Sequence, residues 1–133
     1  MGMLFAHIAV AESHIAAIGL EGREDSDVRS VIGIRIEDDG LPLPKDGLPP
    51  PALAGRDIAY FHGLLRLARE NTRKIAIGLG DSDLDRRIHR RPADGIAREY
   101  NVDWILYHLV EHLAGHHAQI LQLEHLHRAA VDA

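Results

Sequence analysis

The chain of 133 residues contains no cysteine, which excludes disulfide bonds, thiolate metal sites and cysteine nucleophiles. Aromatic residues are also scarce, at 5% of the sequence. No stretch approaches the roughly 18 uninterrupted apolar residues typical of a membrane span. The apolar run over residues 1–10 is interrupted by His7 and has no basic segment before it. We therefore expect a cytoplasmic protein that contacts no membrane.

Positive charge is in short supply as well. Lysine and arginine number 15 against 20 acidic residues, giving a formal net charge of -5. Such a chain has no general electrostatic attraction for nucleic acid or for an anionic membrane. Its length and its 46% hydrophobic content suit one domain with a single core, over residues 1–133. We expect its partner to be a small-molecule substrate.

The spacing of apolar residues predicts an all-α chain with three helices, over residues 3–18, 57–77 and 101–129. Asn101 is expected to cap the last of these. A connection rich in proline and glycine, residues 20–56, separates the first two helices, and Asp-Gly pairs at 39–40 and 46–47 indicate turns within it. Two minor elements complete the prediction: a short strand over 31–36 and a short helix or turn over 81–91.

Ten histidines are the unusual feature of the composition. At about 100° per residue, His112 and His116 lie at the centre of the apolar stripe of the last helix. Their i, i+4 spacing places both rings on one side, which suits chelation of a single ion. His7 and His14 both face inward from the first helix but lie about 10 Å apart along it, so only one of them can join this pair. His62 is a further candidate for a third ligand.

Three imidazole ligands would leave coordination positions for water or substrate, as in catalytic metal sites. The spacing is equally compatible with histidines that only pack in the core, where their nitrogens need hydrogen-bond partners. A basic cluster follows the middle helix. It is either a solvated turn or a site for an anion such as a carboxylate, and its members are Arg86, Arg87, His89, Arg90 and Arg91.

The segment 104–120 reads WILYHLVEHLAGHHAQI, and it resembles the last-helix pattern of the DinB-like superfamily. In that pattern an aromatic residue precedes three histidines at four-residue steps, here Trp104, His108, His112 and His116. The segment LFAHIAVAESH near the N-terminus resembles the helix that carries the first metal ligand in the family, and YFHGLLRLARENTRKIAIGLGDSDLDRRI resembles the helix after it. His117 and Ala118 depart from the usual basic residue and glycine.

The resemblance implies an up-down helix bundle that holds one divalent ion on His7, His112 and His116. The ion would be nickel, zinc or iron, since imidazole suits all three. The resemblance further implies a thiol-dependent transferase or a hydrolase, in which the ion activates a substrate thiol or a water. Because the chain has no cysteine, such a thiol would arrive as a low-molecular-weight substrate or cofactor. Trp104, His108 and residues 20–56 are expected to shape the pocket.

Two other classes of protein remain alternatives: a non-catalytic dimeric bundle that binds a metal or a small molecule, and a structural bundle with packed histidines. The family's bundle begins with a helix ahead of the one that carries the first ligand, whereas this chain starts almost at His7. Three helices would leave an apolar face uncovered, and such a face usually marks an interface. We therefore expect a homodimer, with a truncated sequence as the alternative.

Overall fold

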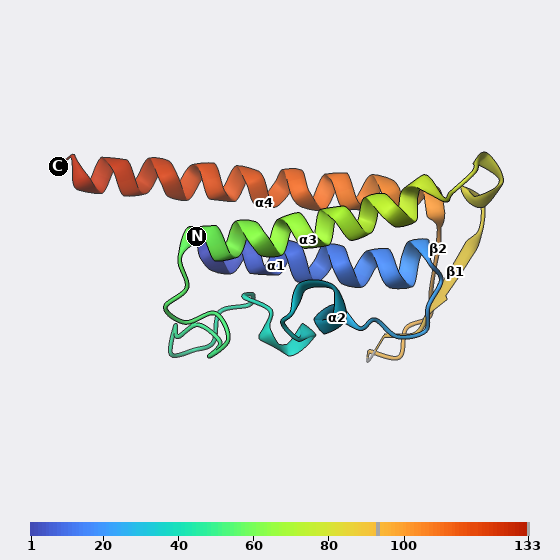
Figure 1. Ribbon diagram of the computed structural model, residues 1–133, viewed down its shortest axis with the longest axis horizontal. Helices are drawn as coiled ribbons and strands as arrows, with labels where there is room; N and C mark the ends of the chain where they lie inside the picture. Colours follow the sequence, from blue (N-terminus) through green and yellow to red (C-terminus); the bar gives the residue numbers. More distant parts are fainter. Residues whose placement is uncertain (93, 133) are drawn as a thin grey trace.

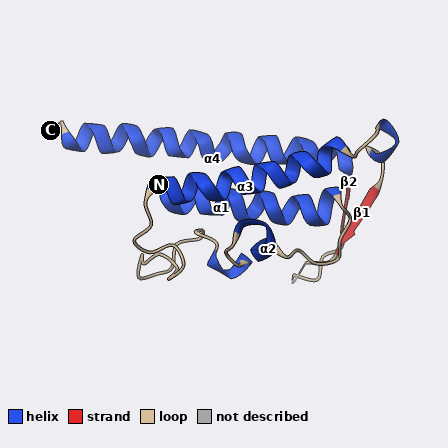
Figure 2. Ribbon diagram, viewed as in Figure 1, coloured by secondary structure: helices blue, strands red, loops and turns tan. Residues whose placement is uncertain are grey.

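The computed structural model describes residues 1–92 and 94–132, which form four α-helices and a two-stranded antiparallel hairpin (Figure 2). The elements are α1 (Gly2–Ile15), α2 (Val28–Ile32), α3 (Ile58–Ile77), β1 (Arg87–Arg90), β2 (Arg98–Asn101) and α4 (Val102–Val131). The fold is thus mostly helical, as expected. The prediction of an all-α protein is wrong because of the hairpin.

Of the three long helices, α1 contacts both α3 and α4, and it runs antiparallel to α4 (Figure 1). A π-helical turn over Ala16–Leu20 continues α1. The side chains of Ala6, Ala9 and Ala16 are completely buried. Small residues at these contacts allow neighbouring helices to approach closely, because the side chains at a contact set the distance between helix axes.

Side-chain caps explain where the long helices begin. Asp57 Oδ1 accepts a hydrogen bond from the Tyr60 backbone N–H at 2.9 Å, and Asn101 Oδ1 accepts one from Trp104 N–H at 2.9 Å. Each satisfies an N–H group that has no partner inside the helix. The helices predicted over 57–77 and 101–129 are therefore confirmed, as is the first helix, which ends close to the predicted position.

The strand predicted over 31–36 is wrong, because α2 occupies the start of this segment. Asp27 caps α2 through a 3.1 Å hydrogen bond from Ser30 N–H to its Oδ1. Gly33 ends the helix with a φ of 83°, a left-handed conformation that glycine adopts at little cost. Capping at both ends outweighs the preference of the β-branched residues between them for a strand.

The helix or turn predicted over 81–91 is correct only at its start, where a 3-10 turn spans Asp81–Asp83. Strand β1 follows and pairs with β2, with Ile88 opposite Tyr100. Ile88 is buried in a cluster with Leu20 and Ile105. Most other strand residues are exposed, so the hydrophobic pattern of the hairpin is too weak to recognise in the sequence.

The continuous helix Gly2–Leu20 is long and apolar enough to cross a membrane by length and composition alone. In the structure 61% of the relevant window is buried inside the protein. Core helices of soluble proteins commonly have this length and composition, and the burial of Gly2–Leu20 follows from its central position between α3 and α4.

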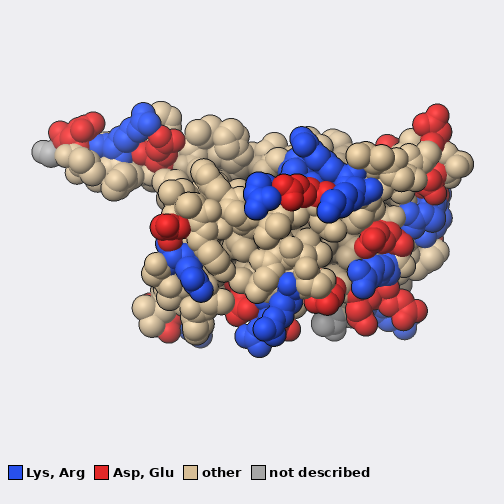
Figure 3. Space-filling model, in the orientation of Figure 1, with Lys and Arg blue, Asp and Glu red and all other residues tan. Residues whose placement is uncertain are grey.

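The longest helix, α4, has 30 residues and projects beyond the ends of α1 and α3 (Figure 1). Its last buried residue in the described chain is Ile120. Beyond it lie four exposed large apolar side chains, Leu121, Leu123, Leu126 and Val131. An apolar groove of about 480 Å³ lies beside α4 and includes Phe5, Leu65, Val110 and Leu113. Figure 3 shows mostly uncharged side chains along the middle of α4.

Candidate metal centre

Three histidines meet where α1 crosses α4. The Nε2 atom of His112 lies 3.2 Å from Nε2 of His7 and 3.2 Å from Nε2 of His116. One ligand atom from each of the three lies within 4.8 Å of the others. Metal–nitrogen bonds of about 2.0–2.1 Å place tetrahedral ligand atoms about 3.3 Å apart, so the cluster has the dimensions of a metal site.

Helix packing produces this convergence. His112 and His116 are one turn apart on α4, and His7 faces them from the antiparallel α1. Ile8 and Ile120 pack together next to the cluster, and Ala16 packs with Ile105 further along the same pair of helices. These apolar contacts set the position of α1 along the axis of α4. In this register His7 lies opposite His112 and His116.

In two of the three histidines, His7 and His116, the nitrogen that faces away from the cluster has a hydrogen-bond partner. His7 Nδ1 lies 2.8 Å from Asp39 Oδ1 and 3.0 Å from Oδ2. His116 Nδ1 lies 2.7 Å from Gln119 Oε1. Donation of the Nδ1 proton to these oxygens leaves the Nε2 lone pairs of His7 and His116 directed at the cluster. This pattern is typical of metal-binding histidines, whose second nitrogen usually donates to a carboxylate or carbonyl oxygen.

Asp39 is the residue that the sequence analysis missed, because the Asp-Gly pair at 39–40 indicated only a turn. The loop that carries it lies directly against the start of α1. A Cβ atom at Gly40 would lie 2.3 Å from the Met3 carbonyl oxygen, so only glycine fits this approach. Asp39 is 32 residues from His7 in sequence, and helical periodicity carries no information over such a loop.

Burial controls the charge of the central histidine. Burial, together with the positive charges that His116 and His7 acquire when protonated, lowers the pKa of His112 to about 4. His112 is therefore neutral at neutral pH. Metal ligation requires a neutral imidazole, so this residue can bind an ion without first losing a proton.

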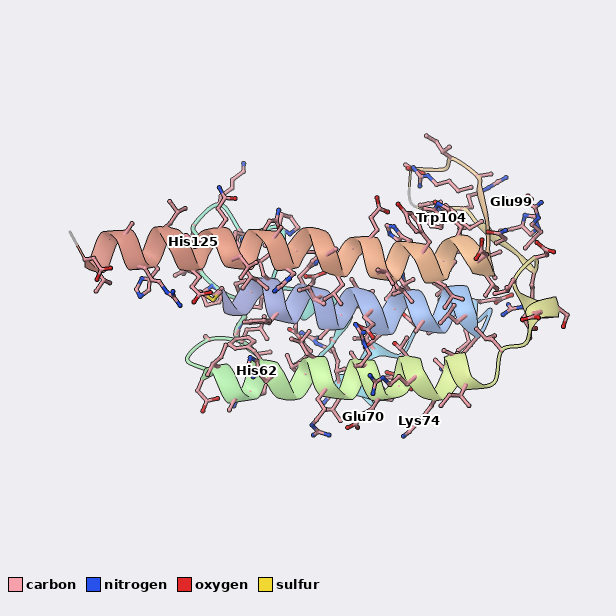
Figure 4. The ribbon with its side chains drawn as sticks, turned by 90° about the horizontal axis from the view of Figure 1, so that it is seen from above. His62, Glu70, Lys74, Glu99, Trp104 and His125 are labelled. Atoms are coloured by element: carbon pink, nitrogen blue, oxygen red, sulfur yellow. The ribbon has the colours of Figure 1, made fainter. Side chains whose placement is uncertain are left out.

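The other two candidates for the third ligand lie elsewhere. His14 Nδ1 contacts the Ser26 hydroxyl, and burial followed by the charge of Arg90 lowers the pKa of His14. His62 lies on α3 (Figure 4) and packs edge-on against the ring of Phe5. Of the three histidines that the sequence analysis considered for this position, the structure brings only His7 to the pair on α4.

His108 lies beside the cluster and does not join it. Its ring stacks on Trp104 with centroids 4.6 Å apart, and its Nδ1 is 3.4 Å from Glu111 Oε2. Both Trp104 and His108 line a small pocket beside the hairpin. That they shape a substrate pocket at the metal site stays a prediction. The connection 20–56 contributes Asp39 to the cluster itself.

Comparisons with protein-family models, curated proteins and solved structures found no match to this chain. The mostly helical fold and the three-histidine cluster agree with the resemblance to the DinB-like superfamily. Membership of that family stays a prediction.

Proposed function

We propose that this protein binds one divalent metal ion through His7, His112 and His116 and is a metal-dependent enzyme. The convergence of three Nε2 atoms carries the proposal. It is supported by Asp39 and Gln119, which hold two of the three rings in the orientation that ligation needs.

A divalent ion in this position would supply Lewis-acid chemistry, since three protein ligands leave room for a water or a thiol whose proton is lost near neutral pH. The chain's own residues position the ligands. Asp39 orients His7, and the packing of α1 on α4 sets the spacing of the three rings. Nickel, zinc and iron all accept imidazole. With no cysteine in the chain, thiol-dependent transfer would use a thiol from outside, and hydrolysis is the other reaction that fits.

Metal content tests the binding part of this proposal. We expect about one nickel, zinc or iron ion per chain in untagged protein purified without added metal. His112→Ala should lose the ion, and His125→Ala, on the projecting end of α4 (Figure 4), should retain it. Sub-stoichiometric metal that is unchanged by His112→Ala would contradict the proposal and favour a structural bundle with packed histidines.

Turnover separates an enzyme from a non-catalytic metal-binding bundle. We expect consumption of a low-molecular-weight thiol with an electrophile, or hydrolysis of an activated ester, that stops when a chelator is added. A chain that holds its ion and turns over neither class of substrate would be the non-catalytic alternative.

We further propose that two copies of the chain associate through the apolar groove beside α4. Apolar side chains line the groove, and further exposed apolar residues follow on the projecting end of α4. Contiguous exposed apolar surface commonly marks a protein–protein interface. A second copy supplies an identical apolar helix that matches the groove in chemistry.

A further inference from the structure

A second pocket, of about 160 Å³, opens on α4 beside the hairpin. Apolar side chains form most of its wall, including Ile18, Ile88 and Ile105. Trp104, His108 and Arg90 also line it and carry groups that can stack or donate hydrogen bonds. Figure 4 shows Trp104 near the hairpin, on the side of α4 that faces away from α3. This is a different cavity from the groove to which we assign the second copy.

A row of stacked rings connects this pocket to the histidine cluster. Tyr100 stacks on Trp104, and Trp104 stacks on His108, with centroids 4.6 Å apart at each step and ring planes 20° and 12° apart. His108 in turn lies 6.1 Å from His112, measured between ring centroids. Tyr100 lies in β2, and Trp104, His108 and His112 follow one another at single turns of α4. Trp104 and His108 in the pocket wall are therefore about 12 and 6 Å along α4 from His112.

Arg90 brings positive charge to the wall of this apolar pocket. One of its nitrogens donates to the Glu24 carbonyl oxygen at 3.2 Å. Within residues 1–92 and 94–132 no carboxylate forms an ion pair with Arg90, whereas the hairpin arginines Arg87 and Arg98 both have acidic partners. A guanidinium has five N–H donors and matches a carboxylate in two parallel bonds, so Arg90 has donors available.

We propose that this pocket binds a small apolar carboxylate, about the size of one aromatic ring, with its anionic group on Arg90 and its other end toward the histidine cluster. The volume equals that of about five water molecules at roughly 30 Å³ each, which limits the ligand to this size. The apolar wall favours a ligand with an aromatic or aliphatic group, and Arg90 favours one with a negative charge. That such a carboxylate is the substrate rests on the proposed function; that it binds here does not.

Trp104 is the only tryptophan, so its fluorescence reports on the pocket directly. We would titrate the full chain with benzoate and with benzamide, its neutral counterpart, in the metal-free and the zinc-loaded forms. Benzoate should change the fluorescence in both forms and bind about tenfold more tightly than benzamide, since a carboxylate forms two parallel charge-assisted hydrogen bonds with a guanidinium and a neutral amide does not. Arg90→Gln should lower benzoate affinity about tenfold and leave benzamide unchanged.

Arg91→Gln removes the same charge from the neighbouring residue, which is outside the pocket, and should bind benzoate like the unaltered chain. Arg90→Lys keeps the charge and should bind with an affinity between those of Arg90→Gln and the unaltered chain. Equal binding of benzoate and benzamide, or equal losses in Arg90→Gln and Arg91→Gln, would overturn the proposal. Benzoate binding in a chain that takes up no zinc would support the pocket and contradict the metal site, so the two failures are distinguishable.

Discussion

Asp39 determines how well His7 can serve as a ligand, because their hydrogen bond fixes which ring nitrogen faces the cluster. The carboxylate also accepts the Leu41 backbone N–H at 3.0 Å, so the loop itself holds Asp39 in place. His7 and Asp39 are 20% and 25% exposed, which shields their interaction partly from water. The orientation of one imidazole therefore depends on a loop that is distant in sequence.

Asp39→Asn should lower the affinity for zinc by about 10–100-fold, the usual effect of losing a partner of a ligating histidine. The amide is a weaker acceptor and no longer compensates the charge of the bound ion. Zinc competition with a chromophoric chelator measures the change. Asp46→Asn is the matched control, because Asp46 accepts a backbone N–H in the same connection without touching the cluster. Equal affinity in both variants would show that Asp39 has no role in ligation.

Proton binding by His112 predicts how the stability of the metal-free protein depends on pH. In the unfolded chain this imidazole takes up a proton near pH 6.5, whereas in the folded chain it does so only near pH 4. Between these values the unfolded state binds more protons, so stability is fully present above about 6.5 and falls as the pH drops toward about 4.

Urea denaturation in the presence of a chelator, repeated across this pH range, measures the effect. His112→Gln removes the titrating group and should flatten the profile over the same interval. If the slope for His112→Gln equals that of the unaltered chain, His112 is not its origin.

Part of the three-histidine cluster could be predicted from the sequence. His112 and His116 follow from helical spacing, because both lie on one apolar face. Spacing left His7 and His14 open, and the resemblance to a known family chose His7. Asp39 and Gln119 could not be predicted as partners, since their contacts depend on the path of a loop and on side-chain rotamers.

Among the helices, α1 and α3 are joined by one ion pair within an otherwise apolar contact. Arg69 on α3 donates to both carboxylate oxygens of Glu12, at 2.8 and 2.9 Å. The Glu12 side chain is 7% exposed and that of Arg69 is 44% exposed. A carboxylate buried this deeply needs its partner.

Arg69→Ala should lower the free energy of unfolding by about 2 kcal/mol, less than the roughly 3–5 kcal/mol for a fully buried pair, because water reaches part of Arg69. Arg66→Ala removes a neighbouring arginine of the same helix, whose pair with Glu70 is exposed, and should cost less than about 1 kcal/mol. Chemical denaturation of the two variants measures these losses in the free energy of unfolding. Similar losses in the two variants would mean that Glu12 does not depend on Arg69.

The long helices were predictable because apolar periodicity and capping residues agree along them. For α3 and α4, Asp57 and Asn101 mark the first turn in the sequence and in the structure. The hairpin and α2 were not predictable in the same way. Both elements are short. Capping by Asp27 stabilises α2, and burial of Ile88 against residues distant in sequence stabilises the hairpin.

For the whole molecule, the groove beside α4 predicts a dimer that one charge can disrupt. Val110 lines the groove and is 69% exposed, so Val110→Asp should leave the folded chain intact and shift it to the monomer. Ile77→Asp is the control, since Ile77 is 86% exposed at the far end of α3. Sedimentation velocity over a range of concentrations gives the result. A monomeric unaltered chain, or a dimer indifferent to Val110→Asp, would contradict the interface.

X-ray absorption of the zinc-loaded, untagged chain shows whether His7, His112 and His116 together hold one ion. We expect about three imidazole ligands at about 2.0–2.1 Å, with oxygen donors completing the shell. His7→Ala should reduce the imidazole count by one. An oxygen-only shell, or an imidazole count unaffected by His7→Ala, would contradict the account.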